Sequence, residues 1–359
     1  MWQPNRVTET LEIRYPLIQA GMAGKATTPE LVAAVSEAGG LGTLGAGYLS
    51  PDGIREAIRE IRRRTSKPFA VNLLVTTEVE ASKEEVWRTQ ELLAPYRKQL
   101  GVEESALTPI AQPFEQQMEV LVEERVPVFS FTFDIPPRRW LDRLREQGTV
   151  LIGTSTTVRE AEQLEAAGVD CIVAQGAEAG GHRGTFAVPY DRGMIGTMAL
   201  IPQTVDRVNL PVIAAGGIMD GRGMAAALAL GAEGIQMGTA FLTCRESGAH
   251  PAHQEKILTE AETETVITRA FSGKPARGIR NRMIDELSGR EQTLPPYPVQ
   301  NALTQGIRKA AARKNDPEWM SLWAGQGLGL AGEWAAGELV QKVIEEAETI
   351  VQRGSQARS

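Results

Sequence analysis

The sequence is poor in cysteine and histidine and has no excess of basic residues. Its 359 residues include two cysteines, Cys171 and Cys244, and three histidines. So few cysteines in a chain of this size are typical of a reducing compartment, and we therefore expect a cytoplasmic protein without a disulfide. The formal net charge of -7 argues against a nucleic-acid-binding surface, because binding to phosphates requires clustered Lys and Arg.

Long hydrophobic runs are also missing. No apolar stretch reaches the roughly 20 residues of a membrane-spanning helix, and residues 1–10 lack the apolar core of a signal peptide. The sequence has no ligand spacing typical of zinc or calcium sites, no nucleophile elbow and no P-loop. We therefore expect no membrane, nucleic-acid or metal partner.

Eight short apolar segments alternate with amphipathic helical patterns between residues 16 and 244. Each segment is nearly continuous in apolar residues, as is typical of parallel strands buried on both faces. Eight such alternations predict an α/β protein with a closed (β/α)8 TIM barrel, and an open doubly wound sheet is the alternative. The predicted strands are residues 16–20, 41–44, 69–75, 127–133, 150–153, 171–174, 211–214 and 234–237.

Capping residues mark the ends of the intervening helices. Thr28 and Ser50 each precede a proline, which suits the first position of a helix, and Thr157 has capping-box spacing to Glu160. Glycines that tolerate a left-handed conformation are expected to end three helices before the next strand. They are Gly39, Gly168 and Gly231.

Two segments depart from the repeat. Residues 78–110 are polar and charged and predict a helical insertion after the third strand. Beyond Arg245 the alternation stops, and the remainder is expected to form helices and loops. We therefore divide the chain into a barrel, 1–245, and a C-terminal helical segment, 246–359, that covers the barrel mouth. The last helix is predicted to bury one apolar face, formed by Leu339, Val340, Val343, Ile344, Ala347, Ile350 and Val351.

The ends of the last two predicted strands are the first candidate ligand site. In barrels of this kind a phosphate often binds the loops after strands seven and eight. Small residues ahead of a helix leave backbone N–H groups accessible to a phosphate. Either turn alone is equally consistent with a tight strand–helix connection, but the two together predict a phosphorylated ligand. The residues concerned are Gly216 and Gly217 after strand seven, and Gln236, Met237, Gly238 and Thr239 at strand eight.

The loop after strand six, residues 175–184, gathers glycines and ionisable residues at a strand end. His182 lies in this loop, whereas His250 and His253 lie in a polar segment further on. A histidine at a barrel strand end can accept or share a proton near neutral pH. The loop is therefore interpreted either as part of an active site or as a solvated surface loop, and we favour the first.

Two further positions are candidates for contact with a ligand. Small residues after the first strand, Ala20 to Ala23, allow a flat ring to lie against the backbone. Asn72 interrupts the apolar third strand, and a buried amide needs hydrogen-bond partners. Those partners are either neighbouring groups of the protein or a ligand, and the sequence does not favour one over the other.

Taken together, these motifs resemble the nitronate monooxygenases, formerly called 2-nitropropane dioxygenases. The resemblance is carried by residues 15–24, 174–184, 214–218 and 236–239. It continues through residues 271–274, 300–301 and 323–327, so it covers nearly the whole chain. The combination is specific, although each motif by itself is not.

The resemblance implies that FMN binds non-covalently in the barrel and that His182 is the active-site histidine. The backbone of Met22 and Ala23 would face the flavin N5 edge. Some members have a second histidine after strand four, where this chain has Phe-Thr-Phe-Asp at residues 131–134. The residues that the resemblance assigns to the flavin are Ala20, Met22, Ala23, Asn72, Gln175, Gly180, Gly181, Gly216, Gly217, Gln236, Met237, Gly238 and Thr239.

The activity that the resemblance implies is the oxidation of an alkyl nitronate with O2, which gives a carbonyl compound and nitrite without consuming a nicotinamide. FMN would carry the electrons, and His182 would either hydrogen-bond the nitro oxygens or deprotonate a neutral nitroalkane. Propionate 3-nitronate is the suggested substrate, and detoxification the purpose. Assembly into a homo-oligomer is left open.

Two other functions are consistent with the same barrel. The first is an NAD(P)H-dependent FMN reductase acting on quinones or enoyl thioesters, which shares the glycine-rich loop after strand six. The second is a barrel that binds FMN or a phosphorylated metabolite without turnover. Residues 178–184, 300–301 and 323–326 favour the monooxygenase over the reductase, and His182 at a strand end argues against a mere carrier.

Overall fold

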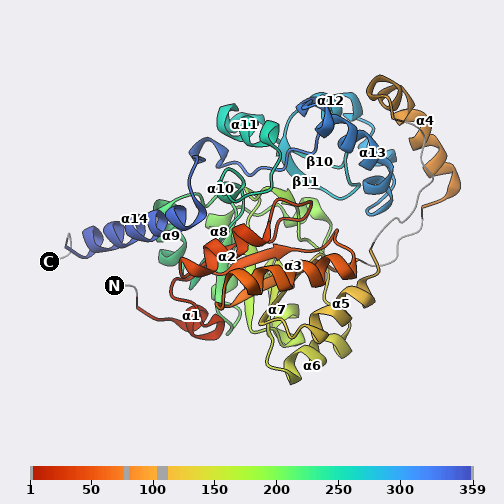
Figure 1. The fold of residues 1–359 in the computed structure, drawn as a ribbon. Coiled ribbons are helices and arrows are strands. Elements are labelled where there is room, and N and C mark those ends of the chain that lie inside the picture. Colours follow the sequence, from red (N-terminus) through yellow and green to blue (C-terminus); the bar gives the residue numbers. More distant parts are fainter. Residues whose placement is uncertain (1–2, 77–80, 103–111, 357–359) are drawn as a thin grey trace.

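In the computed structural model, which describes residues 3–76, 81–102 and 112–356, eight parallel strands form a barrel (Figure 1). The strand order is β1-β9-β8-β6-β5-β4-β3-β2, and a parallel bridge between Ile18 and Leu41 joins the two outer strands. The predicted closed barrel is confirmed, and the open sheet is excluded. The strands are β1 (Leu17–Gln19), β2 (Gly42–Gly45), β3 (Phe69–Leu74), β4 (Val128–Thr132), β5 (Val150–Ser155), β6 (Cys171–Gln175), β8 (Val212–Ala215) and β9 (Gly234–Met237).

The helices between these strands begin and end where the capping residues predict. Side chains of Thr28, Ser50 and Thr157 accept the expected backbone N–H bonds. Gly39, Gly168 and Gly231 have φ values of 96°, 82° and 97°, in the left-handed region. The helices are α2 (Pro29–Glu37), α3 (Pro51–Arg64), α5 (Phe114–Glu123), α6 (Arg138–Glu146), α7 (Val158–Ala167), α8 (Thr197–Val205), α9 (Gly221–Ala229) and the short α10 (Thr239–Leu242).

The barrel interior is filled at its N-terminal end. Side chains of the strands pack there with Val7 and Leu11 of α1 (Arg6–Leu11), and both of these residues are fully or almost fully buried. Cys171 belongs to the same cluster, and both cysteines are buried free thiols. The C-terminal ends of the strands are therefore the end at which a ligand can enter.

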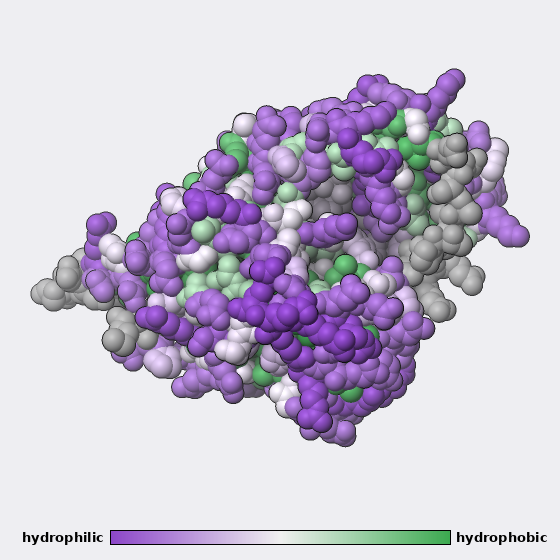
Figure 2. Space-filling view, in the orientation of Figure 1, coloured by the Kyte–Doolittle hydropathy of each residue, from purple (hydrophilic) through white to green (hydrophobic). Residues whose placement is uncertain are grey.

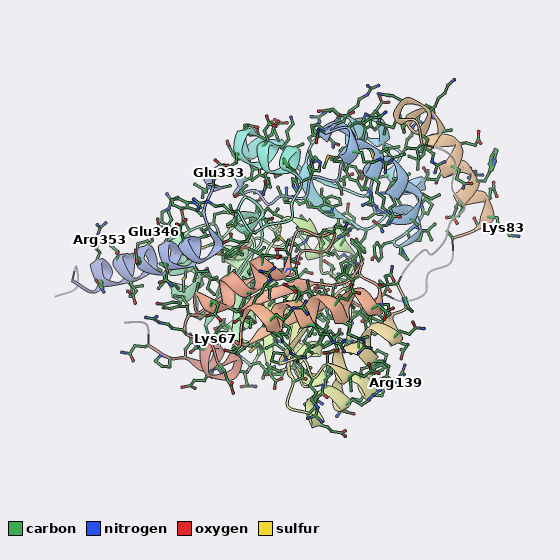
Figure 3. The ribbon with its side chains drawn as sticks, in the orientation of Figure 1. Lys67, Lys83, Arg139, Glu333, Glu346 and Arg353 are labelled. Atoms are coloured by element: carbon green, nitrogen blue, oxygen red, sulfur yellow. The ribbon has the colours of Figure 1, made fainter. Side chains whose placement is uncertain are left out.

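The last helix, α14 (Ala336–Gln356), packs beside the barrel against α9 and α2 (Figure 1). Leu339, Val340, Val343, Ile344 and Ala347 are buried in the barrel's own core, as predicted. The face continues to Ile350 and Val351, but these are 37% and 51% exposed because the helix extends beyond the body of the protein. Figure 3 shows charged side chains along the same helix, among them Glu346 and Arg353.

The remaining elements form a second cluster on one side of the barrel, at the top of Figure 1. The predicted insertion contains α4 (Lys83–Leu100), which packs against α13, and residues 78–80 and 103–110 of that prediction lie outside the described residues. The helices are α11 (Pro251–Thr259), α12 (Arg282–Leu287) and α13 (Val299–Arg313), with the 3-10 helices η2 (Glu262–Glu264), η3 (Glu291–Thr293), η4 (Pro317–Trp319) and η5 (Leu328–Leu330). The 3-10 helix η1 (Tyr190–Gly193) belongs instead to the barrel connection between β6 and α8.

A small antiparallel sheet joins this cluster to the loop after β6. Its strands are β7 (Gly181–His182), β11 (Ala276–Ile279) and β10 (Thr265–Thr268), in the order β10-β11-β7. The expectation of helices and loops alone beyond Arg245 is therefore wrong. His182 pairs with Ala276 in this sheet, so the C-terminal segment fixes the backbone at the predicted active-site histidine.

Within the described ranges, no helix is long and apolar enough to cross a membrane. The face of the protein in Figure 2 is mainly hydrophilic, with small and separate hydrophobic areas.

Candidate active site

His182 lies at the C-terminal end of the barrel among aromatic side chains. Its Nε2 atom is 2.8 Å from the Ser272 hydroxyl oxygen. Its ring centroid lies 5.5 Å from that of Phe133, 5.9 Å from Tyr297 and 5.4 Å from Trp323. We call Phe133, Tyr297 and Trp323 the aromatic group. These rings cover part of the imidazole, which is half-buried, and Nδ1 has no hydrogen-bond partner within the part of the chain that the structure describes.

Two features hold the aromatic group in place. Phe133 follows β4 with a φ of 90°, a backbone conformation that a bulky residue rarely adopts, and its ring is thereby directed at His182. The backbone carbonyl of Trp323 is 3.0 Å from Nε2 of His253, a buried side chain of α11. His253 therefore positions Trp323 instead of lying free in a polar tail.

Two cations act on the imidazole. Lys274 has its Nζ atom 4.5 Å from the centroid of the Phe133 ring, and Arg308 extends from α13. Burial, together with the positive charges of Lys274 and Arg308, lowers the pKa of His182 to about 3. Burial also lowers the pKa of Lys274 to about 8. At neutral pH the imidazole is therefore uncharged, and the Lys274 amine is protonated in most molecules.

Tyr48, in the loop after β2, and Tyr297 extend this cluster, and their phenols interact electrostatically. Burial raises the pKa of both phenols, so both stay neutral donors. The positive charge of Arg308 lowers the pKa of each phenol and so opposes part of the increase caused by burial. The site thus combines neutral hydrogen-bond donors with two cations, which is a composition suited to an anion.

Buried charges fix the loop that carries His182. The Arg183 guanidinium is buried and donates to the carbonyl oxygens of Gln175, Gly176 and Gly193 at 2.6–3.0 Å. The fully buried carboxylate of Glu160, from α7, accepts N–H bonds of 2.7 and 2.9 Å from residues 186 and 187. The loop is therefore a rigid part of the barrel end and not a solvated surface loop.

Gln175, which the family resemblance assigns to the flavin, bonds the same loop. Its Nε2 donates to the His182 carbonyl at 3.1 Å, and its Oε1 accepts from the Gly184 N–H at 2.9 Å. The amide of Asn72 donates to the Ser130 hydroxyl at 2.9 Å, so a neighbouring side chain satisfies at least that group. Both amides are thus held in fixed orientations at the barrel end.

The turn after β8 has the shape that a phosphate cradle requires. Gly216 and Gly217 have φ values of 109° and 73°. A Cβ atom at Gly216 would lie 3.1 Å from the Gly176 carbonyl oxygen and from Oγ1 of Thr197, so only glycine fits there. The Thr197 hydroxyl bonds both Glu178 and the Gly216 carbonyl, at 2.8 and 2.9 Å, and thereby fixes the turn.

The backbone N–H groups at the start of α9, beyond this turn, already have hydrogen-bond partners. Asp220 is its N-cap, and its carboxylate accepts from the N–H groups of Arg222 and Gly223 at 2.9 and 3.3 Å. The first N–H groups of this helix are therefore not available to a phosphate. The accessible backbone is at Gly217, which is exposed, and at the half-buried Gly216 and Gly238.

The segment 323–327 approaches this cradle from the C-terminal part of the chain. The Gly325 N–H donates to Oγ1 of Thr239 at 2.9 Å. A Cβ atom at Gly180 would lie 2.5 Å from the Gly325 nitrogen, so glycine is required there for close packing. On the other side, a Cβ at Gly238 would lie 3.7 Å from both Ala20 and the sulfur of Met22, which brings the tip of β1 to the end of β9.

Comparisons with known proteins agree on one family. A sequence model of the nitronate monooxygenases matches residues 5–346. A relative named probable nitronate monooxygenase, from Staphylococcus aureus, is 48% identical over 354 residues, which are 98% of this chain and 99% of the relative. A relative of the same name from Staphylococcus saprophyticus is 47% identical over 351 residues, 97% of this chain and 99% of the relative. The chain belongs to the nitronate monooxygenase family.

Solved structures show how far the family's fold extends. Nitroalkane oxidase from Streptomyces ansochromogenes superposes with a TM-score of 0.90 at 39% identity, over 99% of this chain and 100% of that one. FabK from Thermotoga maritima gives a TM-score of 0.79 at 35% identity with the same coverage. Because differently named proteins share the barrel, the chemistry has to be argued from the side chains at its end.

The structure thus brings the predicted family residues to one end of the barrel. His182, Asn72 and Gln175 lie there with Ala20, Met22, Ala23, Gly180, Gly181, Gly216, Gly217, Gln236, Met237, Gly238 and Thr239. Sequence reasoning gave no role to several side chains that surround His182. They are Tyr48, Phe133, His253, Ser272, Lys274, Tyr297, Arg308 and Trp323. The family motifs 271–274 and 323–327, and the departure from the family at residues 131–134, were the signals for some of them.

Proposed function

We propose that this chain is an FMN-dependent nitronate monooxygenase that converts alkyl nitronates, such as propionate 3-nitronate, and O2 into a carbonyl compound and nitrite, in the service of detoxification. The observation that carries the proposal is the neutral imidazole of His182 beside the cation of Lys274, enclosed by aromatic rings. A nitronate is a planar anion, and this pocket offers it a positive charge and polar hydrogens away from bulk water.

Two features of the barrel end support FMN as the cofactor. The glycine turn at Gly216 and Gly217 and the end of β9 at Gly238 and Thr239 would hold the phosphate through backbone N–H groups. The tip of β1 at Ala20 and Met22 lies next to Gly238, and its backbone would face the flat ring of the flavin. When bound, FMN supplies the electron transfer between substrate and O2.

The side chains of this chain bind and orient the substrate. Lys274 would hold the negative charge of the nitronate oxygens, and the imidazole of His182 would hydrogen-bond one of them through Nδ1. Phe133 and Trp323 would exclude water, which strengthens both interactions. With a pKa of about 3, His182 is a weak base, so we assign it to hydrogen bonding and not to proton abstraction.

The test uses the purified holoenzyme with preformed propionate 3-nitronate in air. We expect a flavin spectrum, nitrite release and matching O2 uptake without added nicotinamide. The reductase alternative makes the opposite prediction: rapid anaerobic bleaching of the flavin by NADH or NADPH and no nitrite. That result, or a preparation that cannot be reconstituted with FMN, would overturn the proposal. If the flavin of the loaded protein is bleached neither by a nicotinamide nor by the nitronate, the protein would instead be a carrier.

A further inference from the structure

Arg308 is a half-buried cation to which the proposed chemistry gives no role. It extends from α13, and its guanidinium donates to the Asn301 carbonyl at 2.7 Å and to the Asn301 side-chain oxygen at 2.8 Å. Its Nε atom donates to the Thr304 hydroxyl at 3.2 Å. All three acceptors are neutral groups of its own helix. Among the residues that the structure describes, no carboxylate forms an ion pair with Arg308.

This arrangement is electrostatically incomplete. Burial lowers the pKa of Arg308, and the phenols of Tyr48 and Tyr297, not a carboxylate, oppose part of this shift. A guanidinium in a protein stays protonated, so its charge remains and requires compensation. Removing a charge even partly from water without a counterion costs stability unless a ligand supplies the opposite charge.

Printed contacts aside, a chain of neighbouring groups connects Arg308 to the rings around His182. Its Nε donates to the Thr304 hydroxyl, which lies within hydrogen-bond distance of the Phe271 carbonyl oxygen. The Phe271 ring is 5.5 Å from that of Trp323, which lies 5.4 Å from the imidazole. Lys274 lies against a different member of the aromatic group, Phe133. The pocket therefore has two cations at different rings, whereas the nitronate group carries one negative charge.

We propose that Arg308 is a specificity-determining residue that binds a carboxylate of the substrate, separate from the nitronate group held by Lys274 and His182. This inference rests on the proposed function. Tyr48 and Tyr297, both neutral donors beside Arg308, would complete the carboxylate site. The pocket is then matched to a dianion with a charge at each end, and a plain alkyl nitronate leaves Arg308 uncompensated.

The test compares two preformed nitronates of similar length, propionate 3-nitronate and butyl-1-nitronate. In Arg308→Gln, kcat/KM for the carboxylate substrate should fall by about 10- to 100-fold, the range for loss of a hydrogen bond to a charged group. For butyl-1-nitronate it should change less than about 3-fold. Arg308→Lys should recover part of the preference. The exposed neighbour on the same helix, in Lys309→Gln, is the matched control and should change neither value.

Binding provides a readout that does not depend on turnover of a carboxylate substrate. Butyrate, which has no nitronate, should inhibit the reaction of butyl-1-nitronate competitively, and its inhibition constant should rise about 10-fold or more in Arg308→Gln. Equal losses on both substrates, with unchanged inhibition by butyrate, would overturn the role of Arg308. Absence of turnover of either nitronate by a flavin-loaded wild-type enzyme would overturn the proposed function itself, so the two failures are distinguishable.

Discussion

The imidazole of His182 and the hydroxyl of Ser272 are hydrogen-bonded at 2.8 Å, and the direction of the Ser272 O–H decides which ring nitrogen carries the proton. The Ser272 hydroxyl also lies 3.1 Å from the Lys274 carbonyl oxygen. If its proton goes to Nε2, Nδ1 carries a proton and can donate to a nitronate oxygen. If its proton goes to the Lys274 carbonyl, Nε2 donates to Ser272 and Nδ1 can only accept.

His182→Asn separates the two roles of the imidazole. With a pKa of about 3 the ring is too weak a base for efficient proton abstraction near pH 7, so we expect kcat/KM to fall equally, by about 10²-fold, on preformed nitronate and on the neutral nitroalkane. The wild-type profile should show no inflection from this group between pH 5 and 7. A far greater loss on the neutral nitroalkane would identify His182 as a general base.

The pH dependence of kcat/KM should report Lys274. Its pKa is lowered to about 8 by burial, so the cation that attracts the nitronate is present below pH 8 and lost above it. With preformed nitronate mixed in immediately before the assay, kcat/KM should therefore fall as pH rises through about 8. This parameter reports groups of the free enzyme.

Lys274→Met provides the check on that assignment. The variant should lose about 10- to 100-fold in kcat/KM at pH 7, the range for loss of a charged hydrogen bond, and its profile should be flat between pH 7 and 9. Lys309→Met, at an exposed site of α13, is the control and should keep the wild-type profile. A fall above pH 8 that persists in Lys274→Met would assign the titration to another group.

The barrel could be predicted because each of its parts has a local signal. Short apolar segments give the strands, and residues such as Thr28 and Gly168 give the helix ends. The two strands β10 and β11 have no such signal, since each is four residues long and buried Arg277 interrupts the second. They form because they pair with the loop after β6, which is a tertiary effect.

The aromatic and cationic cluster could not be predicted for a similar reason. Tyr48 follows β2, Phe133 follows β4, and Arg308 comes from α13, so its members are far apart in the sequence. The residues next to each of them in the sequence form no motif that indicates a functional site. His182 was predictable only because a barrel strand end is a known location for chemistry, and the same rule says nothing of residues beyond the barrel.

Gly216→Ala should weaken FMN binding through the proposed phosphate turn. The φ of 109° disfavours any side chain, and the new Cβ would lie 3.1 Å from two oxygen atoms, so the turn has to shift. We expect a lower flavin content after purification and a smaller rise in melting temperature on adding FMN. Gly329→Ala is the matched control, because a Cβ there has no neighbour within 4 Å. Full flavin content in Gly216→Ala would contradict the assignment of the phosphate to this turn.

The division of the chain at residue 245 can be tested through α14. Ile344 is 3% exposed and packs in the barrel's core cluster, so Ile344→Ala should destabilise the protein by about 2–5 kcal/mol, the usual range for a buried Ile→Ala change. On the same helix, Ile350 is 37% exposed, and Ile350→Ala should cost much less. Denaturant unfolding followed by circular dichroism measures both. If the barrel forms one cooperative unit with α14, a single transition should shift to lower denaturant in Ile344→Ala. If 1–245 folds independently, a separate transition for the barrel should stay in place.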